Sequence, residues 1–304
     1  MLINNMLKIG IVGLRNADVY MKTLAQTPAF DFCGIYDPSL LFDRHQCSEY
    51  NVFQSFTDLC DNCQAVVFTI DDNLYMPLVT EAVRHSLDVY LDGTYNFTAD
   101  ELRSLMRLRD EADTTILVGH PFIYSDVYQQ LREHCRQPLD IQCNISRTSN
   151  DNLMLLAHNE ISLMLTLLHS DIHRVAVNVF SSFSTLPDAL RVRLDFDNGT
   201  IGNIIIDKYG MASSHSIKVL NYNNMAMADM LTSTITSICS TNADQPALWT
   251  GSATDATSKV RQMNAFYLSI MEGGSIGNSI ENEIRTHIAC EQIRAKMRIN
   301  FNVF

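Results

Sequence analysis

Five short apolar runs lie in the first 120 residues, with helical spacing over 18–26, 77–85 and 98–111, and this pattern limits the fold more than any other feature. The runs cover residues 7–13, 30–36, 65–70, 88–92 and 115–119. Apolar runs of this length, bounded by Gly, Pro or Asp, indicate strands that are buried on both faces. Helical crossovers between such strands make them parallel. The sequence therefore predicts an α/β fold that begins with a doubly wound, Rossmann-like parallel sheet.

The pattern changes near residue 139. A long apolar helix is expected over 153–168, and two more helices over 257–272 and 281–297. Strand-like stretches cover residues 139–147, 174–180, 190–196, 201–209 and 215–220. The residues 197–200, Asp-Asn-Gly-Thr, have the composition of a hairpin turn, which joins antiparallel strands. We therefore expect a Rossmann-like dinucleotide-binding domain over 1–122. A C-terminal α+β domain for substrate binding or oligomerisation, with an open antiparallel sheet, should follow over 123–304.

The charge balance excludes two classes of partner. The chain carries 22 Lys and Arg against 34 Asp and Glu, a formal net charge of −12. A nucleic-acid binder or a protein that adheres to an anionic membrane needs a basic surface instead, so neither partner is expected. No apolar run approaches the roughly 20 residues of a membrane span. The start of the chain has no basic leader segment, which predicts a cytoplasmic location.

The cysteine pattern gives no sign of a metal site. The chain has 8 cysteines, too sparse over 304 residues for a disulfide scaffold. The close pair Cys60 and Cys63 has no second pair and no histidine at zinc-ligand spacing. The sequence therefore predicts reduced thiols and no bound metal.

A glycine directly follows the first apolar run, where a dinucleotide-binding loop would lie. The motif G-x-G-x-x-G lets the backbone approach a pyrophosphate, but only Gly13 is present here. Arg15 and Asp18 replace the other two glycines. Asp37 ends the second run, where a carboxylate can accept from ribose hydroxyls and favour NAD over NADP. The alternative is that Gly13 is only a turn and Asp37 only a strand cap. The candidate cofactor-binding residues are Gly13, Leu14, Arg15, Asn16, Asp37 and Asp92.

The order of several segments resembles the Gfo/Idh/MocA family of sugar and polyol oxidoreductases over nearly the whole chain. These segments are 8–14, 89–98, 118–125, 156–162 and the tail 260–293, which resembles the closing helices of the family. The resemblance identifies the chain as a divergent member. It implies an NAD(P)-binding Rossmann domain, a second α/β domain, and oxidation or reduction of a sugar or nucleotide-sugar type substrate.

The same resemblance exposes two replaced residues. The lysine that polarises the substrate oxygen in the family corresponds to Gly93, and no lysine occurs between Lys22 and Lys208. The histidine that acts as the family's acid and base corresponds to Asn159, which cannot exchange a proton near neutral pH. With the incomplete glycine loop, these replacements predict that the usual hydride transfer is altered or lost. NAD is then a possible cofactor, bound weakly or not at all.

Three residues are candidates for remaining catalytic chemistry. They are His158, next to the replaced histidine, His120 at the end of the fifth apolar run, and Asn159 itself. Two functions stay open: a divergent NAD(P)-dependent oxidoreductase, and a catalytically inactive relative that serves as a binding or assembly subunit. Whether the protein is an enzyme is therefore left open. Strands over 175–180 and 204–206 carry more apolar residues than a one-sided sheet needs, which predicts a homodimer or homotetramer.

Overall fold

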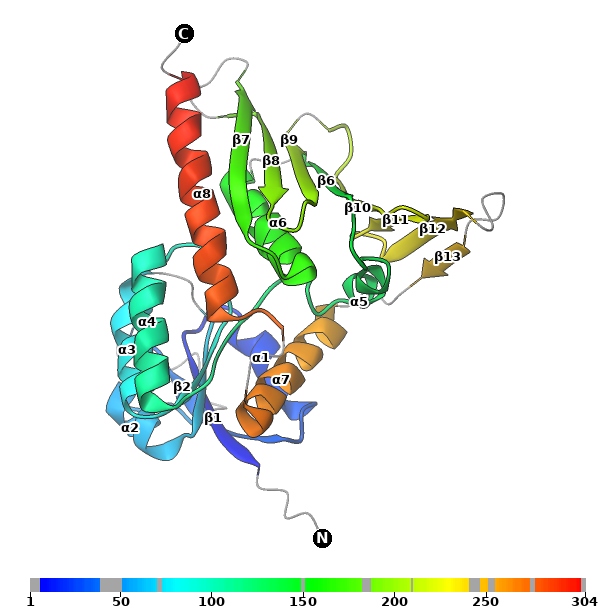
Figure 1. The fold of residues 1–304 in the computed structure, drawn as a ribbon. Coiled ribbons are helices and arrows are strands. Elements are labelled where there is room, and N and C mark those ends of the chain that lie inside the picture. Colours follow the sequence, from blue (N-terminus) through cyan, green and yellow to red (C-terminus); the bar gives the residue numbers. More distant parts are fainter. Residues whose placement is uncertain are drawn as a thin grey trace. The chain divides into compact units, whose positions relative to one another are not determined.

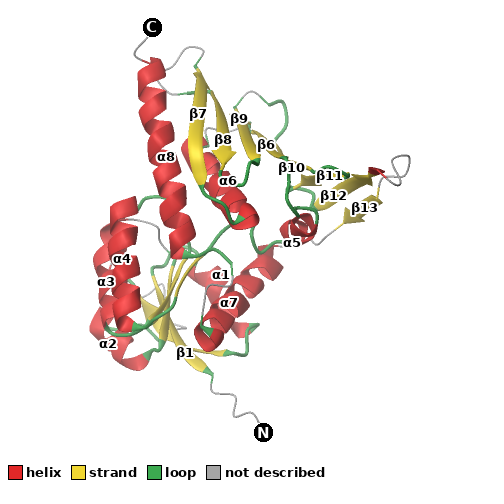
Figure 2. Ribbon diagram, in the orientation of Figure 1, coloured by secondary structure: helices red, strands yellow, loops and turns green. Residues whose placement is uncertain are grey.

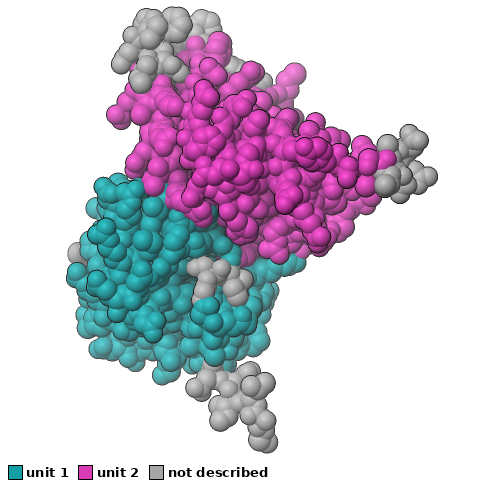
Figure 3. All heavy atoms as spheres, in the orientation of Figure 1, with its two compact units in different colours: residues 1–120, 255–284 teal, residues 121–254, 285–304 magenta. Residues whose placement is uncertain are grey.

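The computed structural model describes residues 6–38, 51–69, 73–148, 151–181, 187–208, 210–240, 247–250, 255–273 and 277–301. The expected strand ends at residues 70 and 209 lie outside these ranges. Internal contacts divide the chain into two compact units (Figure 3). The first unit contains Met1–His120 and Asp255–Ile284, and the second contains Pro121–Thr254 and Arg285–Phe304. The chain thus leaves the first unit and later returns to it, whereas a single boundary was expected from the sequence.

A five-stranded parallel sheet forms the centre of the first unit. Its strands are β1 (Leu7–Val12), β2 (Phe30–Tyr36), β3 (Ala65–Phe68), β4 (Asp88–Leu91) and β5 (Ile116–Val118). They lie in the order β2-β1-β3-β4-β5, and every pair is parallel. All residues of β3 and β5 are buried, as their apolar sequences require. The prediction of a Rossmann-like sheet is confirmed.

Helices cover both faces of this sheet (Figure 1). Figure 1 shows α1 and α7 on one side, and α3 and α4 on the other. The helices of the unit are α1 (Ala17–Ala25), α2 (Phe56–Asn62), α3 (Met76–Arg84), α4 (Ala99–Ala112) and α7 (Asp255–Glu272), with a 3-10 turn η3 (Asn73–Tyr75). α4 begins with a capping box in which Thr98 and Glu101 each satisfy a backbone amide of the other. The sequence did not predict α2.

Aromatic contacts place α7 on the parallel sheet although the whole segment Pro121–Thr254 lies between it and His120 in the sequence. The ring of Phe30 on β2 lies 6.1 Å from that of Phe266 and 5.8 Å from that of Tyr267. The hydroxyl of Tyr90 on β4 donates to Gln262, and both residues are buried. Buried aromatic pairs of this kind contribute more than their apolar area alone, so α7 is an integral part of the first unit.

The second unit contains a sheet of eight strands among the described residues (Figure 2). Its elements are α5 (Asp126–Glu133), β6 (Asp140–Ser146), α6 (Leu153–Leu168), β7 (Ile172–Phe180), β8 (Ala189–Phe196), β9 (Ile201–Asp207), β10 (Ser214–Leu220), β11 (Asn224–Asp229), β12 (Thr234–Cys239), β13 (Ala247–Thr250) and α8 (Ile280–Phe301). The order is β13-β12-β11-β10-β6-β9-β8-β7. Every neighbouring pair is antiparallel except β6 and β9, which are parallel. The expected α+β domain is therefore confirmed, with strands β11 to β13 and helix α5 in addition.

Helix α6 packs closely on the inner face of this sheet. Eleven of its sixteen residues are buried, which explains its nearly uniform apolar sequence. The close approach uses Gly202 on β9, because a Cβ atom there would lie 2.8 Å from the Sδ of Met164 on α6. The hairpin expected at 197–200 joins β8 and β9, with Gly199 at a positive φ of 85°. None of the described helices is long and apolar enough to span a membrane. None of the cysteines that the structure describes takes part in a disulfide.

The outer face of the eight-stranded sheet is mixed in character. Outward positions of β8 include the exposed Arg191 and Arg193, while β9 presents the half-buried Ile205. Near the ends of these strands lies a hollow of about 600 Å³ whose lining includes Phe180 and Asp207. An interface between copies on this face would therefore combine apolar anchors with a polar rim, as protein interfaces commonly do.

We expect the protein to form a homodimer or homotetramer through this face. Light scattering at micromolar concentration should give a mass near two or four times 34.3 kDa. Ile205→Lys should lower that mass, because it buries an unpaired charge between Asn144 and Arg191, which flank Ile205 in the sheet. The control Ser104→Lys, on an exposed site of α4, should leave it unchanged. A monomeric wild type would show that the prediction is wrong.

Candidate functional site

The loop after β1 lies where the strand order of the parallel sheet reverses. β2 lies on one side of β1 and β3 on the other, so the crevice beyond their carboxyl ends is the usual ligand position in such sheets. Gly13 has a positive φ of 96°, and its amide donates to the carbonyl of Tyr36 at 2.9 Å. The hydroxyl of Thr69, after β3, donates to the carbonyl of Gly13 at 3.0 Å. The loop is thus tied to both neighbouring strands.

Asp37 holds the same loop from the end of β2. Its Oδ2 accepts a hydrogen bond from the Leu14 amide at 2.9 Å, and the residue is only 5% exposed. A hydrogen bond from a backbone amide to a carboxylate is of the stronger, charge-assisted kind. Arg15 and Asn16 follow with exposed side chains, and Asn16 caps α1 in the left-handed conformation. The structure therefore brings Gly13, Leu14 and Asp37 together, with Arg15 and Asn16 on the surface beside them.

Asp92, just after β4, is the centre of a polar cluster within the first unit. Its Oδ1 lies 2.5 Å from the Nζ of Lys259 on α7 and accepts from the hydroxyl of Tyr20 on α1. Its Oδ2 accepts from the side-chain amide of Asn16 at 3.4 Å. The candidate cofactor residues Asn16 and Asp92 thus meet, in a group that also contains a cation.

Tyr20 and Lys259 are site residues that the sequence analysis missed. Burial, followed by the neighbouring Tyr90 and Asp92, raises the pKa of Tyr20 well above its ordinary value, so its hydroxyl stays protonated. Lys259 donates to that hydroxyl at 2.7 Å, and its Nζ lies 4.8 Å from the centre of the Tyr20 ring. The Tyr20 hydroxyl therefore accepts one hydrogen bond, from Lys259, and donates another, to Asp92. Asp92 and Lys259 are 167 positions apart, so no local spacing in the sequence predicts that they pair.

The three candidate catalytic residues lie in different surroundings. His120 follows β5, belongs to the first unit and is 4% exposed. His158 on α6 is also 4% exposed, and its Nε2 lies 3.4 Å from the Nε2 of His287 on α8, within the second unit. Asn159 is half-buried on α6, and consecutive helical residues point about 100° apart. His158 therefore packs against α8, in a different direction from Asn159.

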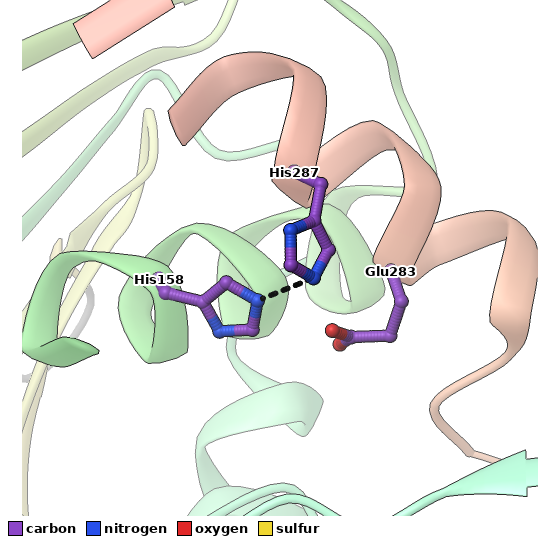
Figure 4. A group of neighbouring side chains, drawn as sticks. All are labelled: His158, Glu283 and His287. Carbon is purple, nitrogen blue, oxygen red and sulfur yellow. Dashed lines mark hydrogen bonds between the residues drawn. The ribbon is translucent and has the colours of Figure 1, made fainter. Parts of the chain in front are cut away.

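Figure 4 shows His158 and His287 with their rings directed toward one another, and Glu283 beside them. Glu283 lies one turn before His287 on α8, and its carboxylate accepts from the side chains of Thr94 and Asn278. The sequence contains one signal for this group, since the spacing E-x-x-x-H places both side chains on one face of a helix. The third member, His158, is 129 residues from His287 and carries no such signal.

Comparison with solved structures gives many chains of the same fold. The UDP-N-acetylglucosamine 3-dehydrogenase of Acidithiobacillus ferrooxidans is 14% identical, with a TM-score of 0.83 over 95% of this chain and 97% of that one. A dehydrogenase of Chromobacterium violaceum is 18% identical, with a TM-score of 0.82 over 98% and 96%. An oxidoreductase of Agrobacterium radiobacter, solved with NAD⁺, L-tartaric acid and magnesium, is 12% identical, with a TM-score of 0.81 over 96% of each chain. The sequence matches no protein-family model and no curated protein.

The chain has the fold of the Gfo/Idh/MocA-type oxidoreductases. The match covers both units, so the fold implied by the resemblance in sequence is confirmed. The Gfo/Idh/MocA-type fold is thus retained although Gly93 and Asn159 stand where that resemblance places a lysine and a histidine. Fold and local chemistry are separate matters, because many chemistries are built on one fold.

Lys259→Met should destabilise the first unit by removing the cation while keeping a side chain of similar length. Asp92 and Lys259 are only 12% and 23% exposed, and a hydrogen bond to a charged group contributes about 1.5–3 kcal/mol. The melting temperature should therefore fall by several degrees, since each kcal/mol lost lowers it by about 2–4 °C.

The matched control is Lys22→Met, an exposed lysine at the end of α1. In a double-mutant cycle, Asp92→Asn should cost less in the Lys259→Met background than in the wild type, because the pair is then already broken. Equal melting temperatures for Lys259→Met and Lys22→Met would contradict the cluster's role.

Proposed function

We propose that the protein is a divergent NAD(P)-dependent oxidoreductase for a sugar or nucleotide-sugar type substrate, with the dinucleotide held by the first unit at the end of β1. The observation that carries the proposal is the bond from the Leu14 amide to the buried Asp37 carboxylate. It joins the glycine loop to the acidic residue at the end of β2, the two features that dinucleotide-binding sheets use.

The residues present fit a dinucleotide in part. In NAD-binding sheets a carboxylate at the end of the second strand accepts from the ribose hydroxyls, and Asp37 has that place after β2. This favours NAD over NADP. The exposed guanidinium of Arg15 offers a positive charge for the pyrophosphate, whereas the exposed Asp18 opposes it. A bound nicotinamide would supply the hydride donor or acceptor. The expected affinity is therefore modest.

The similar structures support the chemical class. One is a dehydrogenase of UDP-N-acetylglucosamine, and another was solved with NAD⁺. In this chain Gly93 and Asn159 stand at the positions where the family has its lysine and its histidine. Turnover therefore needs another proton carrier, for which His120 and His158 are the candidates among the described residues. A cytoplasmic location and a homo-oligomer remain predictions.

The alternative function is that of a catalytically inactive relative, a binding or assembly subunit. Gly93 and Asn159 favour it, and so does the Asp92–Lys259 pair, since that cation already has a carboxylate partner. The two functions differ in one measurable property, because only the oxidoreductase must exchange hydride with a dinucleotide.

Calorimetric titration with NAD(H) and NADP(H) is the direct test. We expect wild type to bind NAD(H) more tightly than NADP(H), and Asp37→Asn to weaken NAD(H) binding by about 10-fold or more, the loss of one charge-assisted hydrogen bond. Asp31→Asn, an exposed aspartate on the same strand, is the control. Absence of any heat with either dinucleotide would favour the inactive relative.

Restoring the lysine and the histidine of the family tests dehydrogenase turnover separately from dinucleotide binding. Gly93→Lys with Asn159→His should raise dehydrogenase turnover, since a positioned acid or base typically contributes about 10²–10⁴ in rate. Adding Arg15→Gly and Asp18→Gly should tighten cofactor binding. Production of NADH is followed by absorbance with sugars and nucleotide sugars as substrates. If wild type already turns over rapidly and His158→Ala abolishes this, His158 is the base and the restored pair is unnecessary.

A further inference from the structure

We infer that His158, Glu283 and His287 form a binding site for a divalent cation of the Zn²⁺ type. One ligand atom from each of the three residues can be chosen so that all lie within 4.8 Å of one another (Figure 4). Two imidazoles and one carboxylate are a common donor set for this ion. The inference does not rest on the proposed function, because none of these groups is needed to hold a dinucleotide. An ion bound to His158 would leave His120 as the candidate proton carrier.

Two helices supply the three side chains. His287 follows Glu283 by four residues on α8, so both project from one face of that helix. His158 projects from the middle of α6, and its ring centre lies 4.9 Å from that of His287. Because the helices are rigid and packed, the three donors are held near one another before any ion binds. Such preorganisation is what a metal site requires.

The distance between the two imidazoles fits an ion as their common partner. Zinc–nitrogen bonds are about 2.0–2.1 Å, so two donors at a tetrahedral angle are about 3.3–3.4 Å apart. The Nε2 atoms of His158 and His287 are 3.4 Å apart. This separation lies within hydrogen-bond range, and it also fits two ligands of one ion.

Burial of the three side chains and the hydrogen bonds around Glu283 also support a cation site. The residues His158, Glu283 and His287 are only 4%, 1% and 1% exposed. A buried carboxylate is costly unless a charge or hydrogen bonds balance it, and a divalent ion supplies that charge. Glu283 also accepts from Asn278 at 2.6 Å and from the Thr94 hydroxyl, which fix its orientation. Metal-binding carboxylates and imidazoles are typically oriented by such outer hydrogen bonds.

The ion would join α6 to α8. Three protein ligands leave a fourth position of a tetrahedral ion for water. Because the site is buried, the ion would enter while the chain folds, and its binding free energy would add to the stability of the folded chain. The site thus explains why a carboxylate and two histidines occupy a core that apolar side chains would fill more simply.

The test is the metal content of the full-length protein. Wild type is incubated with Zn²⁺, desalted and measured by inductively coupled plasma mass spectrometry, and we expect about one zinc per chain, as for a structural site. His287→Gln and Glu283→Gln should each lower the apparent zinc affinity by at least about 100-fold, beyond the 10–100-fold of an outer-shell change. Chelation should lower the melting temperature of wild type and leave His287→Gln unchanged.

The matched control is His215→Gln. His215 is 1% exposed and its Nε2 lies 3.0 Å from the Oε1 of Glu160, so it is also a buried histidine beside a carboxylate. It does not belong to the three-residue group, so this variant should keep its zinc. Wild type without zinc, or His287→Gln with as much zinc as wild type, would overturn the inference and leave a simple pair of histidines.

Cobalt substitution keeps the test decisive if a variant fails to fold. Wild type refolded with Co²⁺ in place of zinc should show the visible absorption bands of a four-coordinate Co²⁺ ion with nitrogen and oxygen ligands. Excess Zn²⁺ should remove these bands. If the refolded wild type binds no Co²⁺ and shows no such bands, the site does not exist.

Discussion

The pairing of Asp92 with Lys259 is the polar interaction on which the first unit most depends. It connects the end of β4 to α7, a helix that returns to the sheet after the whole of Pro121–Thr254. Aromatic contacts from Phe30 and Tyr90 supply the apolar part of this docking. Apolar packing is non-directional, so the ion pair and the bond from Lys259 to the Tyr20 hydroxyl fix the position of α7 along the sheet. A Rossmann-like sheet that ended at β5 would lack this cover.

The elements that the sequence predicts well are those with strong local patterns. Buried parallel strands read as continuous apolar runs, and the capping box at Thr98 marks a helix start without reference to the rest of the chain. Helix α2 was missed because its sequence, FTDLCDN, is short and mostly polar. The strands β11 to β13 were missed because their outward positions weaken the apolar alternation, as in Asn224–Asp229.

The candidate site is harder to predict because its contacts join distant segments. Asp37 and the glycine loop follow a known arrangement, so the sequence identifies both, and the structure brings them within one hydrogen bond. Lys259 is 167 residues from Asp92, and a lysine on a mostly polar helix such as α7 gives no sign of its partner. His158 is 129 residues from His287. Its position in the sequence suggested catalysis, whereas its side chain faces another helix.

The Gfo/Idh/MocA-type fold is present although Gly93 and Asn159 stand where the resemblance in sequence places a lysine and a histidine. The fold therefore does not require those two residues. The polar groups that remain are bonded mainly to the protein itself: Asp92 to Lys259 and Tyr20, and Glu283 to Thr94 and Asn278. Buried polar groups held in this way stabilise a unique arrangement of helices. The loop from Gly13 to Asn16 differs from these groups, because its exposed side chains at Arg15 and Asn16 lie at the carboxyl end of β1, where parallel sheets usually bind a ligand.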